Sequence, residues 1–235
     1  MKIRAVVLTG VALLLAGCFD ARYDFGLNND GSGTIAVDIV LDKDLSRDII
    51  KDGKGKLDKQ ANQSQLGKNA KSSQRVENGS IVVSQRLAFK TLSEITGGDV
   101  DVEVQNLGRS FVGVSRSRIR LATSRNPAKA KADSGGAMAD QFVGQMFKGH
   151  EMRVTMHLPC TVESADELRH DGAVYAPKVE KSWFGSSTVE WRVPMADILA
   201  MQAHGGRHDF VATCWSWAGI TPGRNRPGQV TRLTR

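Results

Sequence analysis

The chain has 235 residues, of which 40% are hydrophobic and 24% are charged, and its formal net charge at pH 7 is +7. This is the composition of an ordinary globular protein. The positive charge is mild and suits a protein beside anionic lipid or envelope polymer, but it selects no class of partner by itself.

The first 17 residues have the pattern of a bacterial export signal. They combine a basic start (Lys2, Arg4), an apolar run over residues 5–16 and small residues directly before Cys18,. The run is too short for a transmembrane helix, which needs roughly 20 apolar residues. We therefore predict a lipoprotein signal peptide over 1–17, lipid on Cys18, and a domain outside the cytoplasm that a membrane holds by this anchor. A plain signal peptide that carries a cysteine by coincidence is the alternative.

Loss of residues 1–17 leaves 30 basic and 25 acidic residues, a net charge of +5. An exported chain is not expected to meet nucleic acid. With Cys18 lipidated, the cysteines that remain are Cys160 and Cys214. In an oxidising compartment we expect them to form a disulfide, with two buried free thiols as the alternative.

The first elements follow in order from the anchor. Residues 19–25 form a short segment, and 28–33 form a turn whose spacing does not match a calcium loop. Alternation predicts a strand over 34–41, and a short helix is expected over 43–50. Residues 51–79 are polar and nearly free of large apolar side chains, so we expect a mobile insertion. A second alternating strand covers 80–90.

A hairpin is expected from strands 99–104 and 111–121, turning around residues 106–108. Its second strand carries Arg116, Arg118 and Arg120 on one face, an arrangement that suggests an anionic ligand. Its first strand carries acids at 99, 101 and 103. We favour an outer face that neutralises its own charge, since opposite charges across strands stabilise a sheet modestly.

The second half has a linker over 123–136 and a strong amphipathic helix over 137–148. Strands are expected over 151–160, 188–193 and 208–217, with a short helix over 195–201. Residues 218–235 contain four arginines and no acid. They are interpreted as a basic disordered tail.

The candidate ligand groove lies between the 137–148 helix and the sheet. Its residues are Met138, Phe142, Met146, Trp215 and Trp217. Met and Phe adapt to irregular ligands, and indoles suit a lipid interface or a sugar ring. The competing interpretation is that the helix stripe packs on the sheet and covers both tryptophans.

No catalytic motif stands out in the sequence. His204 and His208 have the spacing of a helical metal pair, but Gly205 and Gly206 lie between them and break a helix,. We expect neither a metal nor a cofactor, and we expect no enzymatic activity.

The chain resembles the LppM-type family of bacterial lipoproteins. The resemblance rests on Cys18, the turn 30–34 that opens a strand, the polar insertion, and Leu158-Pro159 followed later by Val189-Glu190-Trp191. It implies an exported α+β domain with a role in envelope lipid binding or surface interaction, and it supplies no catalytic residues. The basic end departs from LppM-like proteins that finish in a membrane helix.

Together these features predict one α+β domain over 18–217, with an antiparallel or mixed sheet of five to eight strands packed against one or two helices. The leading function is a lipid-anchored, non-enzymatic envelope protein that binds lipid or another envelope component in the apolar groove. A structural or assembly lipoprotein that engages a protein partner through residues 51–79 or the basic tail is the first alternative. An uncharacterised hydrolase is the second.

Overall fold

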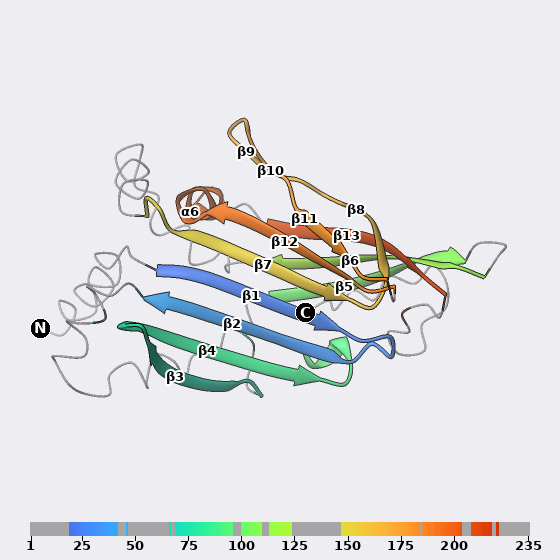
Figure 1. Ribbon diagram of the computed structural model, residues 1–235, viewed down its shortest axis with the longest axis horizontal. Coiled ribbons are helices and arrows are strands. Elements are labelled where there is room, and N and C mark those ends of the chain that lie inside the picture. The colour runs from blue at the N-terminus through green and yellow to red at the C-terminus, as the bar shows by residue number, and fades with distance from the viewer. Residues whose placement is uncertain are drawn as a thin grey trace, which may run out of the picture.

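The computed structural model describes residues 19–41, 46, 66, 69–95, 100–109, 113–123, 147–183, 185–203, 208–217 and 220. Within these ranges most residues lie in β-strands (Figure 1). The predicted α+β balance is therefore wrong for the described part, which is dominated by sheet and has one short α-helix, α6 (Met195–Ala203), and one turn of 3-10 helix at Leu92–Glu94.

The largest sheet has seven strands in the order β11-β12-β7-β1-β2-β4-β3. Its strands are β1 (Phe19–Leu27), β2 (Gly33–Leu41), β3 (Lys71–Glu77), β4 (Ser80–Phe89), β7 (Glu151–Leu158), β11 (Lys178–Lys181) and β12 (Ser187–Pro194). The predicted strands over 34–41, 80–90, 151–160 and 188–193 are confirmed. The insertion over 51–79 is wrong at its end, because β3 is an ordered edge strand.

Strand β1 occupies the middle of this sheet, where we expected only a short segment. It pairs antiparallel with β2 on one side and parallel with β7 on the other. Its burial alternates, with Ala21, Phe25 and Leu27 facing the core. Charged residues at 20, 22 and 24 make the segment too polar to be recognised as a central strand from its composition. The strand is stabilised instead by pairing on both sides.

The second sheet has four strands in the order β5-β6-β13-β8. They are β5 (Val100–Arg109), β6 (Ser115–Thr123), β8 (Thr161–Ala165) and β13 (His208–Ser216). The β5–β6 hairpin is confirmed, but its predicted turn is misplaced, since β5 continues through residues 106–108 with an irregularity in register there. Thr123 ends β6 and does not begin a linker.

The two larger sheets share one core. Their inner faces contribute to a single cluster of buried side chains, and in Figure 1 strands of the smaller sheet overlap β7 and β12 in view. The Trp191 ring on β12 and the Phe210 ring on β13 meet edge to face with centroids 5.5 Å apart. The described part is thus a two-layer β structure rather than one sheet covered by helices.

A small hairpin and the helix α6 lie next to β12. The hairpin β9 (Leu168–His170) and β10 (Ala173–Tyr175) precedes β11, and α6 (Met195–Ala203) follows β12. The Tyr175 hydroxyl donates a hydrogen bond to Asp197 on α6. The predicted helix over 195–201 is confirmed, whereas the strands between 161 and 181 were not predicted.

Several predictions fall on residues outside the described ranges, among them most of the 137–148 helix, the 43–50 helix except Ser46, and the linker. Phe147 and Lys148 lie in a turn, so the helix does not extend to them. Ile220 is buried in the core, so the basic tail does not begin at residue 218. Within the described ranges, no helix has the length and apolarity needed to cross a membrane.

Candidate functional site

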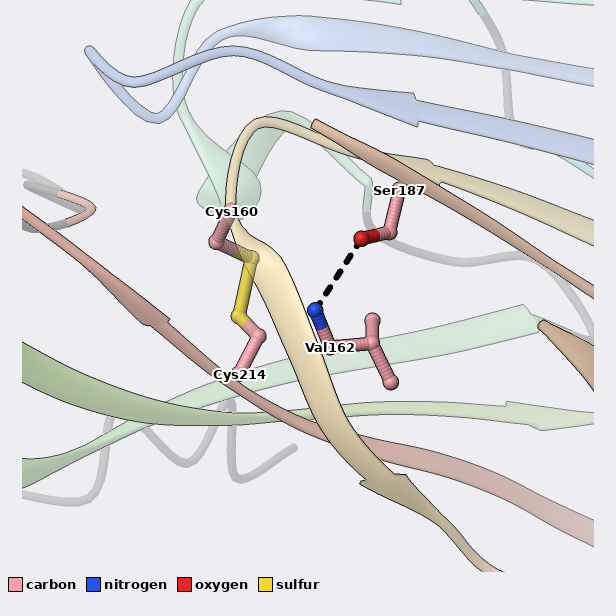
Figure 2. Close-up of a disulfide and its surroundings, with 4 residues drawn as sticks. All are labelled: Cys160, Val162, Ser187 and Cys214. Carbon is pink, nitrogen blue, oxygen red and sulfur yellow. Dashed lines mark hydrogen bonds between the residues drawn. A yellow bond between two sulfur atoms is a disulfide. The ribbon is translucent and has the colours of Figure 1, made fainter. Parts of the chain in front are cut away.

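A disulfide joins the two layers at one end of the molecule. Cys160, which lies between β7 and β8, is bonded to Cys214 on β13, and both side chains are fully buried. Figure 2 shows this bridge beside a second link, in which the Val162 backbone N–H donates to Ser187 Oγ at 3.0 Å. The predicted pairing of the two cysteines is confirmed.

Tryptophan side chains gather at this same end. Trp215 on β13 is half-buried, Trp217 directly after the strand is 69% exposed, and Trp183 in the β11–β12 turn is fully exposed. We call these three residues the tryptophan end. The fourth tryptophan of the chain, Trp191, is buried and donates its indole N–H to the Asp166 carbonyl at 3.0 Å.

Strand register brings the two parts of the tryptophan end together. Trp215 lies opposite Thr161 on β8. A Cβ built on Gly185, in the turn that holds Trp183, would lie 4.0 Å from Thr161 Oγ1. The turn itself is tight, since Ser182 N–H donates to the Ser186 carbonyl at 2.8 Å.

The structure tests the predicted groove only in part. Met138, Phe142 and Met146 lie outside the described residues. Phe147, the next residue, is buried and its ring meets that of Phe19 at 5.4 Å, at the end of β1 opposite to Trp217. The competing interpretation, in which the helix covers both tryptophans, is wrong for Trp217, which is 69% exposed. Trp183 was missed, although an aromatic residue in a short turn between two strands is a recognisable signal.

The arginine face of β6 neutralises itself, as favoured from the sequence; Glu103 is one of the expected acids, whereas the partners of Arg116 and Arg118 differ. Arg120 contacts Glu103 on β5 at 2.9 Å and Asp209 on β13 at 3.0 Å. Arg116 instead contacts Glu163 at 2.6 Å, and Arg118 contacts Asp166 at 3.2 Å. Both of these acids come from β8 or the residue after it, a strand that the sequence did not reveal.

Two titratable groups with shifted pKa values, one buried and one partly buried, lie around α6. His208, at the start of β13, is almost wholly buried, and its ring hydrogen-bonds to the backbone of Ile198. Burial, and then the nearby His170, lower the pKa of His208. Burial, followed by the hydrogen bond to Asp197, raises the pKa of Tyr175 to about 12. Both groups are therefore neutral at pH 7 and act as packing and hydrogen-bonding groups.

Two further histidines pair with acids on β1. His150 Nδ1 lies 3.1 Å from an Asp20 oxygen that also accepts the Glu151 backbone N–H, and His157 Nε2 lies 3.5 Å from Asp24. The His157 side chain is exposed. In the described part of the chain, no group of three or more His, Cys, Asp or Glu residues is arranged to hold a metal ion.

Comparison with known proteins finds one distant likeness. No protein-family model matches the chain, and no curated protein matches it. The NMR structure of the folded domain of LppM from Mycobacterium tuberculosis is similar in fold, with a TM-score of 0.38 and 10% sequence identity over 83% of this chain and 88% of that domain. A likeness of this size assigns neither a family nor a function to this chain.

Proposed function

We propose that this chain is an exported lipoprotein of the cell envelope, held to a membrane by lipid on Cys18. Its β domain binds lipid or another envelope component and catalyses no reaction. The sequence motif around Cys18 suggests the anchor, and the exposed tryptophans suggest a binding role.

The observation that carries the proposal is the position of Cys18 in the chain. It is bonded directly to Phe19, the first residue of the central strand β1. A lipid on Cys18 therefore leaves the folded domain with no linker between it and the bilayer surface. The buried Cys160–Cys214 disulfide supports the same location, because structural disulfides persist in oxidising compartments outside the cytoplasm.

The binding role rests on surface aromatic area. A fully exposed indole at Trp183 and a largely exposed one at Trp217 leave a large amphipathic area in contact with water,. Such area on a folded domain marks sites where lipid, sugar or protein is bound. In contrast, the charged groups on the β6 face are already paired with one another.

The anchor is tested by labelling cells with an alkyne fatty acid and by detergent phase partition of the extracts. The wild-type chain is expected to carry the label and to enter the detergent phase, and Cys18→Ser is expected to lose both properties. A Cys160→Ser/Cys214→Ser double variant is the matched control and keeps the label. Equal labelling of the wild type and Cys18→Ser would refute the anchor.

A second candidate function is a scaffold that engages a protein partner. The exposed edge strand β3, at the end of the predicted insertion, and the exposed Trp183 favour it. A photo-crosslinking residue at position 183 and another at position 73 are expected to yield one defined adduct in cells. An adduct is specific if it is lost when unlabelled protein competes for the partner or when the partner is deleted. If neither position yields a specific adduct, the scaffold function is excluded.

A further inference from the structure

Three of the four tryptophans of this chain lie at one end of it, and the fully exposed one projects from a turn. A projecting indole does not form the flat platform on which sugar rings stack. It is suited to insertion into a soft interface, where the ring is buried and its N–H stays near water. Lys181, two residues before Trp183 on the exposed strand β11, adds a cation beside it.

The tryptophan end lies opposite to the anchor. Phe19 pairs with Leu41 at one end of the sheet, whereas Leu158 pairs with Ser187 at the other, next to the β11–β12 turn. In Figure 1, β1 starts at the left of the sheet and β12 starts at the right. Eight residue steps along β1 separate the two ends by roughly 27 Å.

The charges on the faces between these ends are already paired. On the outer face of the large sheet, Arg153 contacts Glu151 at 2.8 Å and Arg192 contacts Glu190 at 2.7 Å. On the smaller sheet, Arg120 and Arg116 contact Glu103 and Glu163. Paired charges give these faces little net attraction for anionic headgroups, so they favour no flat contact with the membrane that holds Cys18.

We propose that the tryptophan end docks on a second lipid bilayer, one with anionic headgroups, facing away from the membrane that holds Cys18. Trp183 and Trp217 enter the headgroup region, and Lys181 lies at the charged surface. The direction of docking rests on the proposed lipid on Cys18, whereas the docking itself does not.

The test uses the full lipoprotein, extracted from membranes and reconstituted into phosphatidylcholine vesicles, with mass spectrometry to record lipid on Cys18. Acceptor vesicles containing phosphatidylglycerol are added, and tethering is measured by light scattering and lipid-dye energy transfer. Tryptophan emission is recorded in the same samples, and the buried Trp191 supplies a constant background.

We expect tethering to anionic acceptors, with a blue shift of the emission, and little tethering to neutral acceptors. Trp183→Ala is expected to weaken tethering about tenfold or more, since burial of an indole contributes at least that much affinity. Val76→Ala is the control: Val76 is 60% exposed and lies on β3 at the anchor end, opposite Ile81. It leaves tethering unchanged.

Three results would overturn the inference. The same protein is also reconstituted into donor vesicles that contain phosphatidylglycerol, and a blue shift there without tethering means that the tryptophans reach their own membrane. Neither shift nor tethering means that lipid is not the partner, and a protein or glycan then takes this surface. Tethering that Trp183→Ala leaves intact assigns docking to another surface. Absence of lipid on Cys18 refutes the anchor, and pelleting of the unanchored chain with anionic vesicles still tests the docking.

Discussion

Gly33 shows how closely the strands and the core side chains are packed. At Gly33, where β2 begins, a Cβ would meet the Gly26 carbonyl oxygen at 2.1 Å and the Phe89 ring at 2.6 Å. The Phe89 ring is stacked on Phe25 with centroids 6.1 Å apart. The glycine is therefore required by the close approach of β1 and by the core.

We expect Gly33→Ala to lower the free energy of unfolding by about 1–3 kcal/mol, the usual cost of overfilling a packed core. Gly26→Ala is the matched control, because its Cβ would meet only Thr34 Oγ1, at 3.2 Å. Urea unfolding of both variants measures the difference. Equal losses in the two variants would show that the clash at Gly33 is relieved by movement of the strands.

His208 predicts a pH dependence of stability. Its pKa in the folded state is lowered from the ordinary value of 6.5, so the unfolded chain binds more protons just below that pH. The free energy of unfolding therefore falls as pH drops below about 6.5, with a slope of at most about 1.4 kcal/mol per pH unit. His170 and Asp209 act on the same ring, with opposite effects on its pKa.

The measurement is urea unfolding between pH 5 and pH 8 for the wild type and His208→Gln. The variant is expected to lose part of the slope, whatever its stability at pH 8. His157→Gln serves as the control, because His157 is half-exposed. If His208→Gln keeps the full wild-type slope, another group is responsible.

Among the elements, β8 makes most of the contacts that the sequence did not predict. It supplies Glu163 to Arg116, its amide hydrogen-bonds to Ser187, and it follows Cys160 directly. The strand has five residues and only one of them is buried. Its alternation is too short to be recognised, because its stability comes from β13 and from the disulfide rather than from its own side chains.

Removal of the disulfide is expected to lower the free energy of unfolding by about 4 kcal/mol, from the entropy of closing a loop of this length. The sequence separation of the two cysteines is 54 residues. Cys160→Ala/Cys214→Ala, compared by urea unfolding with the oxidised and the reduced wild type, measures the effect. Reduction of the wild type without loss of stability would contradict this role.

The whole molecule is held together by contacts between the layers. Trp191 and Phe210 come from different sheets, and the core cluster draws on both. The mixed sheet brings β1 and β7 together in parallel although 130 residues separate Asp20 from His150, which are in contact. Such pairing depends on chain closure over long distances and leaves no local mark in the sequence.

We therefore expect both sheets to unfold in one transition. Emission from Trp191, at the interface of the layers, is expected to change together with the far-ultraviolet circular dichroism of the strands. Separate midpoints would show that one sheet survives the loss of the other. A Trp183→Phe/Trp217→Phe variant removes the exposed indoles and simplifies the signal without touching the core.

The sequence by itself determined the cysteine pair, since counting leaves one pairing once Cys18 is set aside. It also determined the strands over 34–41, 80–90, 151–160 and 208–217, because apolar and polar residues alternate within each of these segments. Tertiary structure alone decided the central place of β1, the acids that pair with Arg116 and Arg118, and the gathering of three tryptophans at the end opposite to Phe19. These features depend on strand order and register, which are set by packing between segments far apart in the chain.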